Sequence, residues 1–354
     1  MKTTLASEMP VTIAQQDFDA MLSFSRAVYG LKNNAAYLAA MFADLPDAAH
    51  ISTDWPSVLM GFDFHLTADG PKLIEINNNA GGLYIGEQRW LPQPAGVFSD
   101  ALQQRLLAMF PSEWRNIVIM DDAVKEQYMY PEMLAYAELL RAGGRKLWVC
   151  SPDDLQLQAD GLYIDGEKID AIYNRHTDFY LDEHGLEHIR LAYQQDKVVL
   201  NPHPRSYALI GDKSRMVDWW RADLLEGCVD AAQLAQIRAV TPQTYQLAEM
   251  DADQAWAERK QWVFKPSARH GGKGVVLGKA MSRKRFAALD VSETIVQRLI
   301  PASSVDVEGR DMKLDIRLYM HGADLIAVAG RVWRGQLTNF REPGSGWVSL
   351  NIEG

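Results

Sequence analysis

The chain has 354 residues with two cysteines, 47% hydrophobic and 23% charged residues, and a formal net charge of −10 at pH 7. This length predicts two or three domains of an ordinary globular protein, and the separated cysteines and the lack of an apolar leader predict reduced thiols and a cytoplasmic location. The acidic balance, without a run of basic residues, argues against nucleic acid or an anionic membrane as the main partner.

Residues 14–44 predict a pair of helices, because apolar residues recur there at three- and four-residue spacing. Asn33-Asn34 marks the break between them. This stripe is typical of core packing and carries no chemistry. A further helix is expected over 91–110, opened by a proline near its start and closed before Pro111.

The stretch 58–77 predicts a β-hairpin, because two short apolar runs flank Asp69-Gly70, which favours a tight turn. Glu75 and Asn77 are two residues apart on the second strand, so their side chains leave the same face. Asp63 on the first strand projects beside them. Two carboxylates and an amide oxygen form a site suited to Mg²⁺, with Mn²⁺ as a substitute.

A solvated strand face is the alternative for so short a pattern. The abrupt change from Leu73-Ile74 to the polar, glycine-rich loop 78–82 favours a site, since glycines let a ligand approach the backbone.

Residues 116–120, 146–150 and 171–175 predict strands, with a helix over 130–144, and this spacing indicates a parallel α/β layer. Ligands of such sheets collect beyond the carboxyl ends of the strands. Asn174, Arg175 and Asp178 fall at one such end, and the planar guanidinium of Arg175 suits a substrate carboxylate. A strand end capped by polar residues and exposed to water is the alternative.

An apolar strand places Lys265 at its end, and a glycine-rich loop through Gly274 follows. Glycines let backbone N–H groups converge on phosphate oxygens, and a lysine adds positive charge. The loop matches neither the P-loop nor the dinucleotide fingerprint. A merely flexible hairpin loop is the alternative.

Residues 313–320 alternate cleanly, so that Lys313, Asp315 and Arg317 share one face of a strand. Gly322 turns the chain, and the returning strand carries Arg331. Alternating charges usually mark a solvent face, but Arg317 and Arg331 lie on strands that a hairpin would pair, which supports a shared positive site.

In this order the motifs resemble those of ATP-grasp ligases. They are Lys213 after Asp212, Lys265-Pro266 with its glycine loop, the strand 296–300, Asp315-x-Arg317, Arg331 and Asn339. The Asp strand and Glu-x-Asn that the family carries after this point lie instead at the front. The order therefore resembles circularly permuted ATP-grasp proteins such as eukaryotic glutathione synthetase.

Two features depart from that enzyme. Its lid loop carries an acidic metal ligand where this chain has Arg269 and His270, although Asp63 can replace it as the strand acid does in bacterial ATP-grasp ligases. The chain is also short for a glutathione synthetase, so that substrate is not transferred.

The resemblance implies an α/β chain with α+β subdomains, a circularly permuted ATP-grasp fold and a Rossmann-like pre-ATP-grasp domain. Residues 1–112 and 301–354 would form the large ATP-grasp subdomain, 113–205 the α/β substrate domain, and 206–300 the small lid subdomain.

The resemblance also implies an ATP-dependent carboxylate–amine ligase. It would join small amino-acid-like substrates through an acyl phosphate and release ADP and phosphate, with ATP and Mg²⁺ as cofactors. The implied catalytic residues are Arg331, Arg317 and Lys265. The implied nucleotide-binding residues are Lys213, Lys265, Gly271, Gly272, Gly274, Gln297, Arg298, Leu299, Ile300, Asp315 and Asn339. Asp63, Glu75 and Asn77 would hold the metal, and the expected substrate residues are Asn79, Tyr84, Tyr130, Asn174, Arg175 and Asp178.

Two other functions stay open at this stage: a phosphotransferase on the same scaffold, and a nucleotide-binding partner protein without turnover. A nicotinamide oxidoreductase is disfavoured, because the first strand–helix turn, 121–130, contains no glycine. We expect small-molecule carboxylate and amine substrates and neither a nucleic-acid nor a membrane partner. The oligomeric state stays open, with a homodimer among the alternatives.

Overall fold

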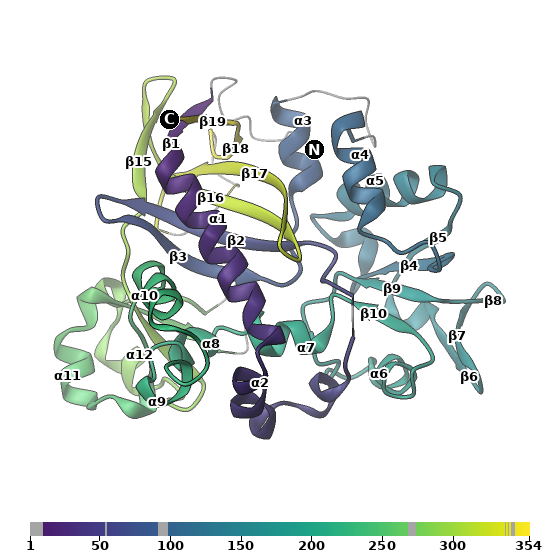
Figure 1. The fold of residues 1–354 in the computed structure, drawn as a ribbon, viewed down its shortest axis with the longest axis horizontal. Coiled ribbons are helices and arrows are strands. Elements are labelled where there is room, and N and C mark those ends of the chain that lie inside the picture. Colours follow the sequence, from purple (N-terminus) through teal and green to yellow (C-terminus); the bar gives the residue numbers. More distant parts are fainter. Residues whose placement is uncertain are drawn as a thin grey trace.

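The structure is a computed structural model that describes residues 10–53, 55–90, 98–267, 274–336, 338, 340 and 344–354. Helices and sheets are mixed throughout. In Figure 1 the large central sheet lies between a small sheet with its helices, at the lower left, and a parallel sheet at the right. None of the helices in these ranges combines the length and apolar character that crossing a lipid bilayer requires.

The central sheet joins the front of the chain to its back. Its strands, in spatial order, are β18 (Gly346–Val348), β17 (Asp324–Trp333), β16 (Arg310–His321), β2 (Met60–Thr67) and β3 (Gly70–Asn77), and β15 (Ser303–Val307) also pairs with β16. β2 runs antiparallel to β16, with Asp63 opposite Arg317. The predicted hairpin is therefore present, and it folds against late strands as the motif order predicts; the circular permutation itself stays a prediction.

A β-bulge in the hairpin sets which side chains face the apolar core and which face the opposite side of the sheet. Asp63 lies opposite Glu75 and Phe64 opposite Leu73, so Ile74 is the extra residue on β3. Phe64 and Leu73 are fully buried in the apolar core, whereas Asp63 and Glu75 face the opposite side of the sheet.

The predicted helical pair is present as α1 (Gln15–Gly30) and α2 (Ala35–Met41). Helix α1 packs on the apolar face of this sheet and runs across its strands in Figure 1, whereas α2 lies beyond the sheet. Phe24 of α1 packs edge-to-face on Phe64, with ring centroids 5.9 Å apart. Asn34 caps α2 by accepting a hydrogen bond from the backbone N–H of Tyr37. Close to the chain ends, β1 (Val11–Ala14) pairs in parallel with β19 (Leu350–Glu353).

The predicted parallel layer is confirmed. Its strands, in order, are β10 (Val199–Asn201), β9 (Ala171–Asn174), β4 (Asn116–Met120) and β5 (Lys146–Cys150), and all three pairs are parallel. Further elements of this region are α5 (Tyr130–Ala142), α6 (Glu187–Gln194), α7 (Pro204–Ser206), and a small sheet of β6 (Gln156–Gln158), β7 (Gly161–Ile164) and β8 (Glu167–Lys168).

The small antiparallel sheet contains a strand that the sequence did not predict. Its order is β11 (Thr244–Gln246), β14 (Thr294–Arg298), β12 (Trp262–Pro266) and β13 (Val276–Leu277). The helices of this region are α8 (Arg215–Asp218), α9 (Ala222–Leu225), α10 (Ala231–Val240), α11 (Ala252–Ala257) and α12 (Arg283–Ala287). The sequence gives no signal for β11, because a three-residue strand is too short to show a periodic pattern.

The expected helix over 91–110 is also wrong in its bounds. The structure forms α4 (Asp100–Ala108) and, before it, an unpredicted α3 (Leu83–Trp90), while 91–97 fall outside the described residues. The start of α3 depends on a distant side chain. The buried Glu132 carboxylate accepts hydrogen bonds from the N–H groups of Gly82 (3.0 Å) and Tyr84 (2.9 Å), which supplies a cap that no local pattern reveals.

Candidate active site

A cavity of about 580 Å³ lies between the central sheet and the small sheet, a volume in the usual range for a ligand site. Most of the predicted nucleotide, metal and catalytic residues line it together. They are Asp63, Glu75, Asn77, Lys265, Gln297, Arg298, Leu299, Ile300, Asp315, Arg317 and Arg331. Lys313 lines it too, in agreement with the predicted face shared by Lys313, Asp315 and Arg317.

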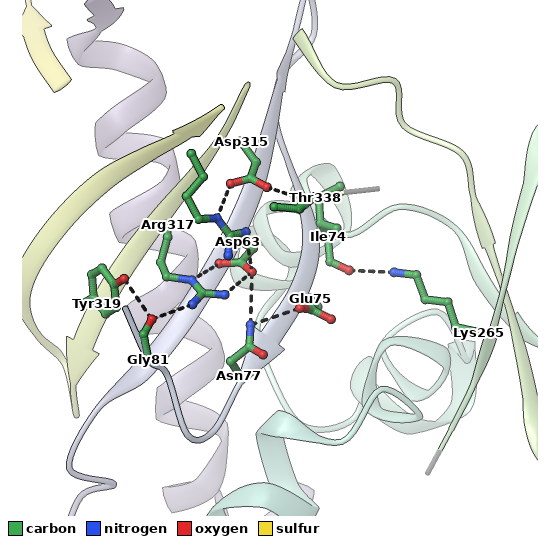
Figure 2. A network of polar contacts seen from close by, with 11 residues as sticks. Asp63, Ile74, Glu75, Asn77, Gly81, Lys265, Asp315, Arg317, Tyr319 and Thr338 are labelled. Atoms are coloured by element: carbon green, nitrogen blue, oxygen red, sulfur yellow. Dashed lines mark hydrogen bonds and ion pairs between the residues drawn. The ribbon is translucent and has the colours of Figure 1, made fainter. Parts of the chain in front are cut away.

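Two carboxylates and two guanidiniums form a buried network on this face of the sheet (Figure 2). Arg317 binds Asp63 through both fork positions, with Nε 2.6 Å from Oδ1 and Nη2 2.7 Å from Oδ2. Arg331 bridges the carboxylates, since its Nη2 lies 2.8 Å from Asp63 Oδ2 and its Nε lies 2.5 Å from Asp315 Oδ1. Thr338 donates its hydroxyl to the other oxygen of Asp315 at 3.0 Å.

The charge states of the Asp63 pair follow from this pairing. Burial alone would raise the pKa of Asp63, but the Arg317 and Arg331 guanidiniums outweigh it and hold that pKa below its ordinary value. Burial alone would lower the pKa of Arg317, which Asp63 reverses, so that the pKa is raised. Both side chains are therefore charged at neutral pH.

The three metal ligands predicted on the hairpin agree only in part with the observed contacts. Asn77 donates through Nδ2 to Asp63 Oδ2 (3.1 Å) and to Glu75 Oε1 (3.3 Å), and Glu75 is half-buried at the cavity wall. Glu75 and Asn77 thus present oxygens of the kind that Mg²⁺ prefers. Asp63, by contrast, already accepts from two guanidiniums. Across the described residues, no group of three or more His, Cys, Asp or Glu side chains could hold a metal ion.

Lys265 of the small sheet forms a direct contact with the hairpin. Its Nζ donates to the carbonyl oxygen of Ile74 (2.9 Å), the bulged residue beside Glu75, and to Gln297 Oε1 (2.6 Å). Burial lowers the pKa of Lys265 from 10.5 to about 8; the nearby Glu75 carboxylate opposes this and the Lys213 ammonium adds to it. The cavity therefore contains a desolvated, titratable lysine close to a carboxylate.

A second cavity of about 490 Å³ adjoins the first. The two share four lining residues: Asn77, Arg317, Arg331 and Phe340. Of the predicted substrate residues, Asn79 and Arg175 line this second cavity.

Arg175 is buried at the wall of the second cavity. Its Nη1 contacts Asn79 Oδ1 and lies 3.1 Å from both the carbonyl oxygen of Ala80 and the Tyr173 hydroxyl. Asp121 lines the same cavity, and burial raises its pKa to about 6, although Arg175 acts against that rise. The cavity therefore offers a fixed cation and a titratable carboxyl group to one ligand.

Other predicted residues do not line either cavity. Lys213 is buried near Lys265, Gly274 is exposed, and Tyr84 and Tyr130 pack on the apolar core around the parallel sheet. Asn174 and Asp178 accept hydrogen bonds from backbone N–H groups of their own loop, as in the alternative of a capped strand end. The predicted Gly271, Gly272 and Asn339 fall outside the described residues.

The sequence reasoning missed several residues that line the cavities. In the first these include His65, Lys279 and Trp333, and in the second Asp121, Gln127, Tyr128, Phe179, Tyr207 and Trp347. Only Asp121 had a signal, because it follows the first parallel strand directly. The aromatic residues come from separate loops and strands, and no periodic pattern connects them.

Comparison with solved structures identifies the fold. A glutathione synthetase-like effector (GSS30) from Globodera pallida, in its apo form, matches with a TM-score of 0.61 and 11% identity, over 98% of this chain and 90% of that chain. A gamma-glutamylcysteine synthetase-like protein from Methylobacillus flagellatus KT matches with a TM-score of 0.55 and 14% identity, over 93% of this chain and 87% of that chain. No protein-family model and no curated protein sequence matches the chain. These likenesses show the fold alone, and it is the ATP-grasp-like fold that the motif order predicts.

Proposed function

We propose that this chain, whose fold is ATP-grasp-like, is an ATP-dependent carboxylate–amine ligase that forms an amide or peptide bond between small amino-acid-like substrates. The larger cavity would bind ATP, and the second cavity would bind the carboxylate substrate. ADP and phosphate would be the other products.

One observation carries this proposal: the two cavities meet at two guanidiniums. Arg317 and Arg331 line both cavities, and Arg175 lines the second at another part of its wall. A phosphoryl group passing from one cavity to the other would therefore pass the two fixed cations. Phosphoryl transfer depends mainly on positioning and on neutralising charge, which such an arrangement supplies.

The proposed reaction has two steps, formation of an acyl phosphate and formation of the amide. A carboxylate oxygen attacks the γ-phosphorus of ATP, the bond to the β-phosphate oxygen breaks, and an acyl phosphate and ADP form. The amine nitrogen then attacks the acyl carbon, loses its proton, and inorganic phosphate leaves. Lys265 would neutralise the nucleotide phosphates, and Arg331 and Arg317 would hold the transferring group.

The nucleobase would lie against residues 297–300 and the ribose against Asp315, as the resemblance implies. The Lys213 ammonium is close enough to Lys265 to affect its pKa. Lys213 would therefore add positive charge near the phosphates without contacting them. Glu75 and Asn77 would hold Mg²⁺, which when bound neutralises the terminal phosphates.

The structural neighbours support ligation over phosphotransfer to a hydroxyl. The two neighbours described above are related by their names to glutathione synthetase and gamma-glutamylcysteine synthetase. Both names denote the joining of amino-acid-like units. The second cavity fits the same class of substrate, because it holds Arg175 and Asp121 together.

The test is a screen of amino-acid pairs with ATP and Mg²⁺ that measures released ADP and product mass. A ligase gives ADP together with an amide whose mass is the sum of both substrates minus water. A phosphorylated product without need of an amine would identify a phosphotransferase instead. ATP binding without ADP release from any pair would contradict both enzymatic functions.

A further inference from the structure

We infer that Asp63 positions the two arginines at the junction of the cavities, and that the metal is held without it, by Glu75 and Asn77. This assignment depends on the proposed nucleotide site and changes the role of one residue in it. The ATP-grasp resemblance implied a metal ligand at Asp63, whereas the geometry points to a different function.

The first evidence is that the Asp63 carboxylate already binds both guanidiniums and the Asn77 amide. Its Oδ1 accepts from Arg317 Nε at 2.6 Å, and its Oδ2 accepts from Arg317 Nη2 (2.7 Å), Arg331 Nη2 (2.8 Å) and Asn77 Nδ2 (3.1 Å). Its side chain is 1% exposed. A cation that bound Oδ2 would have to displace a guanidinium, and one that bound Oδ1 would share that oxygen with Arg317. In either place the cation would lie beside two fixed positive charges.

The second evidence is the contrast with Glu75 on the paired strand. Glu75 is half-buried at the wall of the larger cavity and, among the described residues, forms no ion pair within 4.0 Å. Its Oε1 accepts a hydrogen bond from Asn77 Nδ2 that is 3.3 Å long. Glu75 therefore keeps oxygen lone pairs for a cation. A rotation of the Asn77 amide would turn its oxygen to the same side and would remove only the longest contact of Asp63, at 3.1 Å, so that the three guanidinium contacts of Asp63 remain.

The third evidence is where the arginines are fixed. Arg317 also donates through Nη1 to the carbonyl oxygen of Gly81 at 3.1 Å, in the loop that follows β3. Arg331 is tied at its other end to Asp315. Asp63 is the group that both guanidiniums share, so it sets their separation and orientation where the two cavities meet.

The experiment measures the binding of Mn²⁺ with a non-hydrolysable ATP analogue, by electron paramagnetic resonance, in wild type, Asp63→Asn and Glu75→Gln. Asp69→Asn is the matched control, since Asp69 is an exposed carboxylate at the turn of the same hairpin. We expect Asp63→Asn and the control to bind Mn²⁺ within about threefold of wild type, and Glu75→Gln to lose at least about tenfold in affinity. We expect Asp63→Asn to lower kcat on the order of 10²-fold, because the arginines lose their orientation.

Asp63→Asn leaves two buried arginines with one carboxylate fewer, so the charge-balanced variant D63N/R317Q is measured beside it. Mn²⁺ affinity near the wild-type value in either folded variant supports the inference. If the Asp63 variants lose as much Mn²⁺ affinity as Glu75→Gln while wild type binds Mn²⁺ normally, the inference about Asp63 is overturned and the proposed function stays intact. Absence of Mn²⁺–nucleotide binding in wild type overturns both.

Discussion

Lys265 Nζ lies 2.9 Å from the carbonyl oxygen of Ile74, and this hydrogen bond joins residues that are 191 positions apart in the chain (Figure 2). Lys265 is the next-to-last residue of β12 in the small sheet, and Ile74 is the bulged residue next to Glu75 on the hairpin. The bulge exposes a carbonyl group that the ladder does not use, and Lys265 binds it. The contact therefore brings to one cavity the lysine and the carboxylate that, in the proposed function, would neutralise the nucleotide phosphates and hold the metal.

The first prediction concerns the charge of Lys265. Lys265→Met keeps a side chain of similar length but removes the ammonium, so ADP release should fall on the order of 10²–10³-fold. Turnover assays with saturating substrates measure this loss, and thermal unfolding checks that the fold is kept. Lys260→Met is the control, because Lys260 is exposed on the same small subdomain and should be without effect. Equal activity of the two variants would contradict the role of Lys265.

The second prediction concerns pH. Because burial lowers the pKa of Lys265 to about 8, the lysine is charged below pH 8 and loses its proton above it. ATP affinity should be constant below pH 8 and weaken by up to about tenfold per pH unit above it. Lys265→Arg should remove this decline, since arginine stays charged. Titration calorimetry of a non-hydrolysable ATP analogue from pH 7 to 10 measures both curves.

The stability effect of the same lysine has the opposite sign. Its pKa in the folded state, about 8, lies below the ordinary value of 10.5, so the unfolded chain binds more protons between these pH values. The contribution of Lys265 to the free energy of unfolding therefore rises with pH in this window. Urea unfolding measures the free energy of unfolding of wild type and of Lys265→Arg at each pH. The difference between the two values isolates the contribution of Lys265. A difference that falls with pH would show that the lysine is not desolvated.

The alternation of side chains on strands was enough to predict much of the candidate site. Period two placed Glu75 beside Asn77, and Lys313 beside Asp315 and Arg317, and all five line the larger cavity. The alternation could not predict which of the side chains in the site form hydrogen bonds or ion pairs with one another.

Pairing depends on tertiary contacts. Asp63 binds Arg317 across 254 positions of the chain, which decides whether it faces a metal or a guanidinium. Helix α3 and the loop 78–82 before it are held by Glu132, about 50 positions later. The aromatic wall of the second cavity is likewise assembled from separate loops, so neither the pocket nor its shape was visible in the sequence.

The third prediction concerns the substrate carboxylate. Arg175→Lys keeps the charge but loses the planar fork and its contacts with Ala80 and Tyr173, so KM for the carboxylate substrate should rise on the order of tenfold to 10²-fold. The affinity for ATP should stay near the wild-type value, because Arg175 lines only the second cavity. Steady-state kinetics with each substrate varied separately measure this split. A rise in KM for ATP alone would place Arg175 at the nucleotide instead.

The last prediction concerns Gly82, at the end of the loop 78–82 that follows β3. Gly82 has a φ of +91°, and a Cβ added to it would lie 2.2 Å from Cζ2 of Trp347, a buried ring at the wall of the second cavity. Gly82→Ala should therefore combine backbone strain of about 1 kcal/mol with overpacking of about 1–3 kcal/mol. Gly70→Ala is the matched control, because Gly70 has a similar φ of +86° but no atom within 4 Å of the added Cβ, so only the strain remains. Urea unfolding should show a clearly larger loss of stability for Gly82→Ala. Equal losses for the two variants would mean that Trp347 moves aside freely, and that the loop is not fixed by this contact.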